Sequence, residues 1–190
     1  MTHFPSLPDH AHLGDLFVRF RRGVAPLLAL HDELLRSPSE LSVAERELIA
    51  AYVSGLNACA FCVGAHTLMA RAFGIEDSVF SALLEDPDTA PIPDKLRPVF
   101  HLARALTSSP GRGPARECHA VLDAGWSEQS LFEIISIVAL YNYMNRIVDG
   151  AGILPGPEYA NPTPEQMQAR REGNYTRWGV AIGAIAADPG

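Results

Sequence analysis

Two cysteines and a histidine follow one another at spacings that suit thiol chemistry: Cys59, Cys62 and His66. On an α-helix these positions fall on one face, because residues i, i+3 and i+7 line up. Gly55 and Asn57 predict that the helix begins near Cys59, where its N-terminal amides stabilise negative charge on sulfur. An imidazole one turn further on can accept or return the thiol proton. The pattern indicates a redox site in which one thiol ionises and the second resolves its oxidised form.

Glu47 is the acidic residue best placed to assist His66. It lies twelve residues before Cys59, on the helix expected to precede the cysteines. If the two helices form an antiparallel hairpin, the Glu47 carboxylate meets the imidazole and selects its tautomer, as the third member of a catalytic triad does. The alternative readings are a solvated glutamate and an ordinary, partly buried histidine, and the spacing favours the functional reading.

A zinc site is the main alternative use of the cysteine pair, because CxxC also supplies half of many structural zinc sites. His66 would make a third ligand, but no second CxxC is present and the other candidate ligands are remote in sequence. We therefore predict no metal. The remote candidates are His31, His101 and His119.

No cofactor is expected either. The chain lacks the glycine-rich loops that bind dinucleotides or nucleoside triphosphates, and Val63 follows Cys62 where a haem-attachment motif requires histidine. The net charge of −7 argues against nucleic-acid binding. The longest apolar runs are too short to span a bilayer, and no signal peptide is recognisable, so the expectation is a cytoplasmic protein that contacts no membrane.

The periodicity of apolar residues predicts an all-α protein. With 190 residues, 47% of them hydrophobic, one core and a single domain over residues 1–190 are the economical interpretation. A core over about residues 30–153 is expected, with an N-terminal segment and a tail, 154–190, that is peripheral or contacts another subunit. The expected helices cover residues 11–36 (one or two helices, interrupted near Gly23 and Pro26), 43–55, 59–73, 76–84, 94–106, 115–124, 131–148 and 165–185.

Several other reactive side chains receive no catalytic role. Cys118 stands alone and is predicted to be a small buried side chain. The remaining histidines near the N-terminus are assigned to a loose segment: His3, His10 and His12.

The motif Glu-x11-Cys-x2-Cys-x3-His, from Glu47 to His66, resembles the core of the alkylhydroperoxidase D-like (AhpD-like) and carboxymuconolactone decarboxylase superfamily. The segment from Tyr141 to Asp149 resembles the helix beside the site in the peroxidase-related branch of that superfamily. Together the resemblance covers most of residues 30–153. It implies an AhpD-like helical bundle that assembles as a homo-oligomer, as a dimer, trimer or hexamer.

The resemblance also implies a thiol-dependent peroxidase or disulfide oxidoreductase. Cys62 would attack a hydroperoxide substrate, Cys59 would close a disulfide, and His66 with Glu47 would relay the proton. An external dithiol would restore the thiols, and lipoyl groups do so in the best-known relatives. Phe61 stands where the best-known peroxidase has a histidine, which removes one polar contact from the thiols.

Two other functions stay open at this point. The lactone-decarboxylase side of the superfamily suggests a cofactor-free lyase that works by proton transfer and does not need the cysteines. A non-enzymatic redox sensor would use the same disulfide to control an interaction surface. Retention of both cysteines favours redox catalysis over the lyase.

Overall fold

The computed structural model describes residues 1–109, 111, 113–159 and 162–187. It confirms the all-α fold, because no strand occurs in these ranges. The α-helices are α1 (Leu13–Arg19), α2 (Val24–Arg36), α3 (Val43–Leu56), α4 (Ala60–Ala72), α5 (Asp77–Glu85), α6 (Arg97–Ser108), α7 (Ala115–Asp123), α8 (Glu128–Ala151), α9 (Pro164–Glu172) and α10 (Tyr175–Ala181). The described residues also form the short 3₁₀ helices η1 (Asp94–Leu96) and η3 (Pro157–Tyr159).

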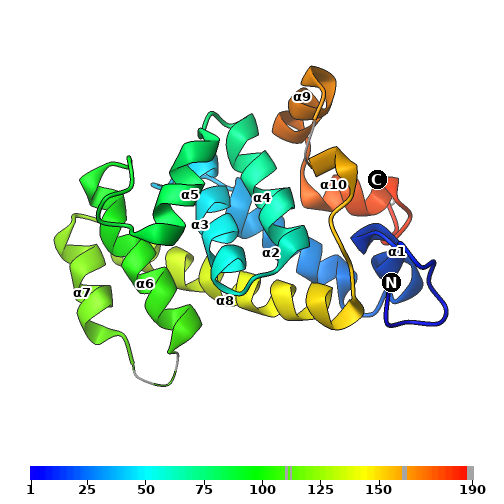
Figure 1. Ribbon diagram of the computed structural model, residues 1–190, viewed down its shortest axis with the longest axis horizontal. Helices are drawn as coiled ribbons and strands as arrows, with labels where there is room; N and C mark the ends of the chain where they lie inside the picture. The colour runs from blue at the N-terminus through cyan, green and yellow to red at the C-terminus, as the bar shows by residue number, and fades with distance from the viewer. Residues whose placement is uncertain (110, 112, 160–161, 188–190) are drawn as a thin grey trace.

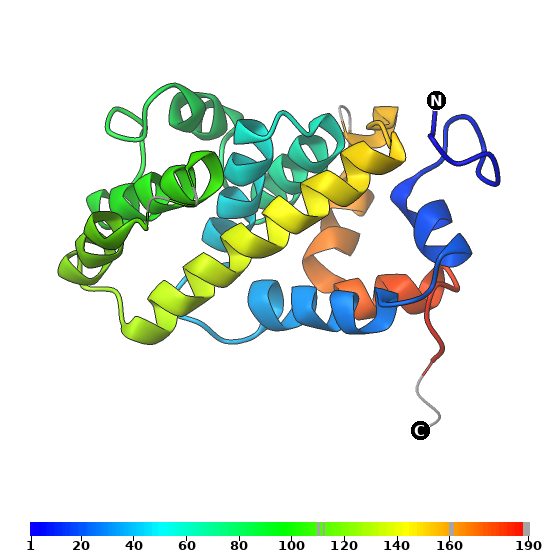
Figure 2. The same ribbon diagram turned by 90° about the horizontal axis from the view of Figure 1, so that it is seen from below.

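Helix α8 runs along the length of the molecule and contacts α2, α3, α4, α6 and α7 (Figures 1 and 2). Ser127 caps its first turn, and Gly152 ends it in the left-handed conformation that glycine adopts without strain. Within the described ranges, α8 alone is long and apolar enough by length and composition to cross a membrane. Its contacts with five other helices account for that apolar character, because a helix at the centre of a bundle buries side chains on several faces.

Helices α3 and α4 form an antiparallel hairpin, the arrangement on which the expected contact between Glu47 and His66 depends. Ser42 and Glu45 make the capping box that begins α3. Every residue of α3 from Arg46 to Ser54 is buried, because α4, α5, α6 and α8 surround it. The hairpin therefore holds two helix faces in fixed register at the centre of the fold.

The C-terminal region differs from the expected continuous segment 165–185. It forms two helices, since α9 ends at Glu172 and the Asn174 side chain caps α10 by accepting the Arg177 backbone N–H at 2.8 Å. Helix α9 packs on α4 and α10 packs on α2 of the same chain. Both views show α1, α9 and α10 together at the end of the molecule remote from α6 and α7 (Figures 1 and 2).

Candidate active site

The turn between α3 and α4 fixes the position of the first cysteine. Ala58 adopts a left-handed conformation (φ 56°), which costs an L-residue roughly 1–2 kcal/mol. Two hydrogen bonds connect this region to α8. The Asn57 side-chain amide donates to Asn145 Oδ1 at 2.9 Å, and the Asn145 side-chain amide donates to Ser54 Oγ at 3.0 Å. Cys59 is consequently the N-cap of α4, at the positive end of the helix dipole.

The two sulfur atoms are adjacent but differ in their surroundings. Cys59 Sγ and Cys62 Sγ lie 2.7 Å apart as free thiols. Cys62 lines a cavity, whereas Cys59 is fully buried and does not. The hydrogen bond to Cys62, with burial, raises the pKa of the Cys59 thiol. Cys59 therefore keeps its proton and can donate a hydrogen bond to the sulfur of Cys62.

His66 and Glu47 are brought together by the α3–α4 hairpin. His66 Nδ1 lies 2.6 Å from Glu47 Oε2, the contact that the sequence predicted. Burial alone would raise the pKa of the fully buried Glu47, but His66 and Arg36 outweigh it and lower that pKa. An ionised Glu47 accepts the Nδ1 proton, which leaves Nε2 as the nitrogen available to a reacting group.

Glu47 makes two further contacts that were not predicted from the sequence. Arg36 Nη1 lies 2.6 Å from Glu47 Oε1, and Tyr175 Oη donates to the same oxygen at 3.1 Å. The guanidinium of Arg36 lies between the rings of Phe73 and Tyr175, at 5.7 and 5.0 Å from their centroids. Burial lowers the pKa of Arg36, but the nearby Glu47 carboxylate raises it by a larger amount, so the net effect is a raised pKa. Both partners are therefore charged. In the sequence, Arg36 is distinguished only by its position as a basic residue in the last turn of a helix, which does not indicate a contact with Glu47.

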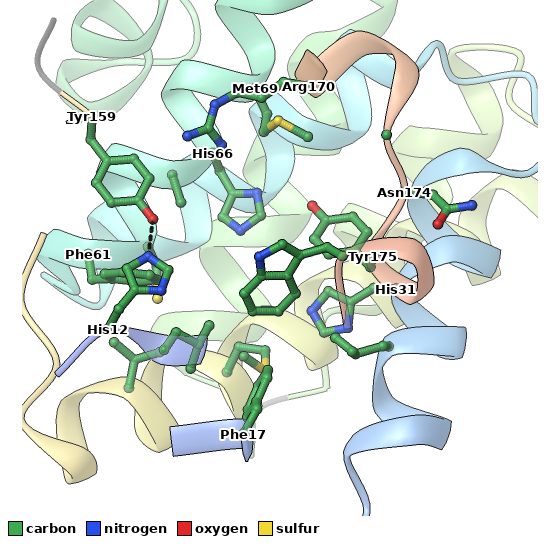
Figure 3. Close-up of a pocket in the computed structure, with 18 of the residues that line it drawn as sticks. His12, Phe17, His31, Phe61, His66, Met69, Tyr159, Arg170, Asn174 and Tyr175 are labelled. Carbon is green, nitrogen blue, oxygen red and sulfur yellow. Dashed lines mark hydrogen bonds between the residues drawn. The ribbon is translucent and has the colours of Figure 1, made fainter. Parts of the chain in front are cut away.

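The cavity in front of Cys62 and His66 has a volume of about 450 Å³ (Figure 3). Most of its lining is apolar or aromatic, and the described lining residues come mostly from α4 and from α1, α2, α8, η3, α9 and α10. Helix α4 contributes one wall of the cavity, made of Phe61, Cys62, Ala65, His66 and Met69. The lining comprises His12, Leu13, Phe17, Leu28, His31, Arg36, Phe61, Cys62, Ala65, His66, Met69, Tyr141, Met144, Val148, Tyr159, Gln166, Ala169, Arg170, Gly173, Asn174, Tyr175 and Trp178.

The N-terminal segment and the tail therefore belong to the site, which corrects the expectation for His12. Far from lying in a loose segment, His12 caps α1 and hydrogen bonds through Nε2 to Tyr159 Oη at 2.8 Å (Figure 3). The Phe61 ring contacts both side chains, with centroid distances of 5.3 Å to each. An aromatic cluster thus borders Cys62 where the best-known peroxidase has a second histidine.

His31 lies across the cavity from Phe61 (Figure 3). Its Nδ1–H donates to the Leu27 carbonyl at 2.8 Å, and its ring packs against that of Tyr175 at 4.9 Å. Burial lowers the pKa of His31 to about 4, so the ring is neutral at physiological pH.

Within the part of the chain that the structure describes, no three or more His, Cys, Asp or Glu side chains are grouped so that they could hold a metal ion. The groups that the geometry does bring together are a dithiol and an acid–base dyad. This arrangement can ionise one thiol, move its proton to and from a bound molecule, and form a disulfide.

Comparisons with known proteins agree with the architecture. Residues 24–87 match the model of the carboxymuconolactone decarboxylase family. A crystal structure of an uncharacterised peroxidase-related protein from Silicibacter sp. TM1040 is 24% identical, with 70% of each chain covered and a TM-score of 0.66. A structure described as an alkylhydroperoxidase AhpD core, an uncharacterised peroxidase-related protein from Ralstonia eutropha JMP134, is 25% identical over 70% of each chain, with a TM-score of 0.65. No protein of curated function matches the chain.

Proposed function

We propose, on the premise that this chain is an AhpD-like member of the carboxymuconolactone decarboxylase superfamily, that it is a thiol-dependent peroxidase that reduces organic hydroperoxides through Cys62 and Cys59. Its reductant is an external dithiol, of which a lipoyl group is one example. His66 and Glu47 move the proton. In this proposal the protein acts as a homo-oligomer in the cytoplasm.

The reaction begins when His66 Nε2 takes the Cys62 proton and the thiolate attacks the terminal oxygen of the hydroperoxide. The O–O bond breaks, Cys62 becomes a sulfenic acid, and the leaving alkoxide takes the proton back from His66 to give an alcohol. Cys59 then attacks the sulfenic sulfur, and water leaves as the disulfide forms. A dithiol reduces that disulfide by two thiol–disulfide exchanges and is itself oxidised to a disulfide.

The difference between the two sulfurs is the observation that carries this proposal. Only Cys62 lines the cavity, and Cys59 lies 2.7 Å behind it with a raised pKa. An attacking thiol must reach the substrate and must ionise, whereas a resolving thiol needs only to reach its partner. The access of Cys62 to the cavity and the raised pKa of Cys59 both support Cys62 as the attacking thiol.

The test is hydroperoxide consumption in the presence of excess dithiol. Cys62→Ser is expected to abolish turnover, whereas Cys118→Ser, which changes a thiol outside the cavity lining, retains it. Unchanged consumption by the Cys62→Ser protein would falsify the assignment.

A cofactor-free lyase is the second candidate, because the Glu47–His66 dyad in an aromatic cavity can move protons without any thiol. Its activity would survive a conservative replacement of both cysteines by serine. Lactone decarboxylation by the Cys59→Ser/Cys62→Ser protein, without peroxide consumption by the unaltered protein, would reverse the order of the two candidates.

A further inference from the structure

Among the residues that the structure describes, the Arg, Lys, Asp and Glu side chains on the cavity wall are of one sign. Of the 22 described residues that line the cavity, two are arginines and none is aspartate or glutamate. The chain as a whole has the opposite balance, with 22 acidic and 15 basic residues. A cavity whose walls carry positive charge within an acidic protein concentrates anions at that position.

The two arginines are not equivalent. Arg36 is neutralised by Glu47, which lies behind the cavity wall at 2.6 Å. Arg170 makes no ion pair within the described ranges, and its guanidinium lies 5.6 Å from the centroid of the Tyr159 ring. Among the described lining residues, Arg170 therefore supplies the uncompensated positive charge.

Arg170 stands at the cavity mouth. It belongs to α9, which buries none of its residues and so forms the outermost wall. Figure 3 shows its side chain beside Tyr159 and near His66, on the side of the pocket where α4 contributes its residues. An anionic group bound there would remain close to solvent, which lowers the cost of its desolvation.

The interior beyond Arg170 suits an apolar body. Its surface includes Phe17, Leu28, Met144, Val148 and Trp178. The volume of about 450 Å³ lies within the range of small-ligand pockets, roughly 300–1,000 Å³. Transfer of the apolar surface of a ligand from water into such an interior favours binding.

We propose that this cavity binds organic monocarboxylates, with the carboxylate paired to Arg170 and the hydrocarbon body among the apolar residues. For the reaction this inference rests on the proposed peroxidase function: the preferred substrate is the hydroperoxide of such an acid. Binding of the unoxidised acid needs no thiol chemistry and can be measured separately. Apart from Leu28 on α2, the residues responsible belong to α1, α8, α9 and α10 and lie outside residues 24–87, which match the family model.

The experiment compares decanoate with 1-decanol, which share a ten-carbon chain and differ in charge, by calorimetric titration. Decanoate is expected to bind about tenfold or more tightly, because a charge-assisted contact contributes roughly 1.5–3 kcal/mol. Arg170→Gln should remove that preference and leave decanol unaffected. Arg177→Gln is the matched control, because Arg177 is an exposed arginine on α10 outside the cavity lining.

The location of the ligand is read from tryptophan emission. Trp178 lines the cavity, whereas the second tryptophan of the chain, Trp126, is buried outside it. In a Trp126→Phe protein, decanoate should shift the emission of Trp178. Three results would each overturn the inference. They are equal affinities for decanoate and decanol, an equal effect of the two arginine substitutions on decanoate binding, and no binding of either probe.

Turnover measurements separate this inference from the proposed function. A fatty-acid hydroperoxide should have a lower KM than its methyl ester, and Arg170→Gln should equalise the two. Decanoate binding through Arg170 without peroxide consumption would reject the peroxidase and retain the carboxylate site. Peroxide consumption with equal KM values for acid and ester would retain the peroxidase and reject the carboxylate site.

Discussion

The guanidinium of Arg36 contacts one oxygen of the Glu47 carboxylate at 2.6 Å, while His66 contacts the other oxygen at the same distance. Glu47 therefore has a permanent counter-charge and does not depend on a protonated His66 for its own ionisation. A carboxylate held ionised in this way orients the imidazole in both of its protonation states, which a proton relay requires.

Glu47→Gln is expected to lower the free energy of unfolding by about 3 kcal/mol, because it leaves the partly buried Arg36 without its charged partner. Urea unfolding measures the loss. Adding Arg36→Met should recover part of that stability, since the unpaired charge is then removed as well. Strictly additive losses in the double variant would show that the two residues do not stabilise each other.

Cys59→Ser should stop the cycle after one oxidation. Without the adjacent thiol, the sulfenic acid on Cys62 cannot resolve within the protein, so one equivalent of hydroperoxide is consumed. Mass spectrometry of the peptide that contains Cys62 is expected to find one added oxygen atom, or an adduct when a sulfenic-acid reagent is present. Multiple turnovers by this variant at the rate of the unaltered protein would contradict the resolving role of Cys59.

His31 makes stability depend on pH between about 4 and 6.5. Its pKa is lowered to about 4 in the folded protein, chiefly by burial, and is about 6.5 when unfolded. In this range the unfolded chain binds a proton that the folded protein does not, so stability decreases as the pH falls, by up to about 3 kcal/mol.

Equilibrium unfolding of His31→Gln across the same range is expected to have a shallower slope. His101→Gln is the control, because His101 is a surface histidine paired with Asp88. Glu47 affects stability in a different pH range. Because its pKa is lowered in the folded protein, its contribution to stability is complete above about pH 4.5 and is lost as the pH falls further. An unchanged slope in His31→Gln would mean that other groups cause the pH dependence.

Ala65→Phe should discriminate between hydroperoxides by size. Ala65 lines the cavity one turn after Cys62, so a phenyl ring there occupies space in front of the sulfur. Turnover of cumene hydroperoxide is expected to decrease by about tenfold or more in kcat/KM, whereas hydrogen peroxide retains most of its rate. A parallel loss with both substrates, in a protein of unchanged Tm, would argue against the cavity as the substrate site.

The contact between Glu47 and His66 could be predicted from the sequence because it depends on local rules. A helix with a capping box, a short turn and a second helix fix the register of a hairpin, and one register brings these two residues together. The order of the helices, including the long apolar helix that contains Tyr141, follows from the periodicity of apolar residues.

Contacts across long stretches of chain could not be predicted in this way. Tyr175 reaches Glu47 over 128 positions, and His12 reaches Tyr159 over 147. These contacts depend on how α1 and α10 dock, and no spacing rule encodes that docking. Gly179 illustrates the difficulty: an added Cβ would collide with the Leu28 side chain, so α10 approaches α2 closely because one position lacks a side chain.

The cavity takes its walls from helices made at different times during translation. Helix α4 and its N-cap, which carry both sulfurs, leave the ribosome before α9 and α10, which line the cavity in front of Cys62. A nascent chain therefore exposes its dithiol to cellular oxidants until the last two helices dock. Any early disulfide would lie beneath them once they dock, so the protein can emerge from biosynthesis already oxidised and need reduction before its first turnover.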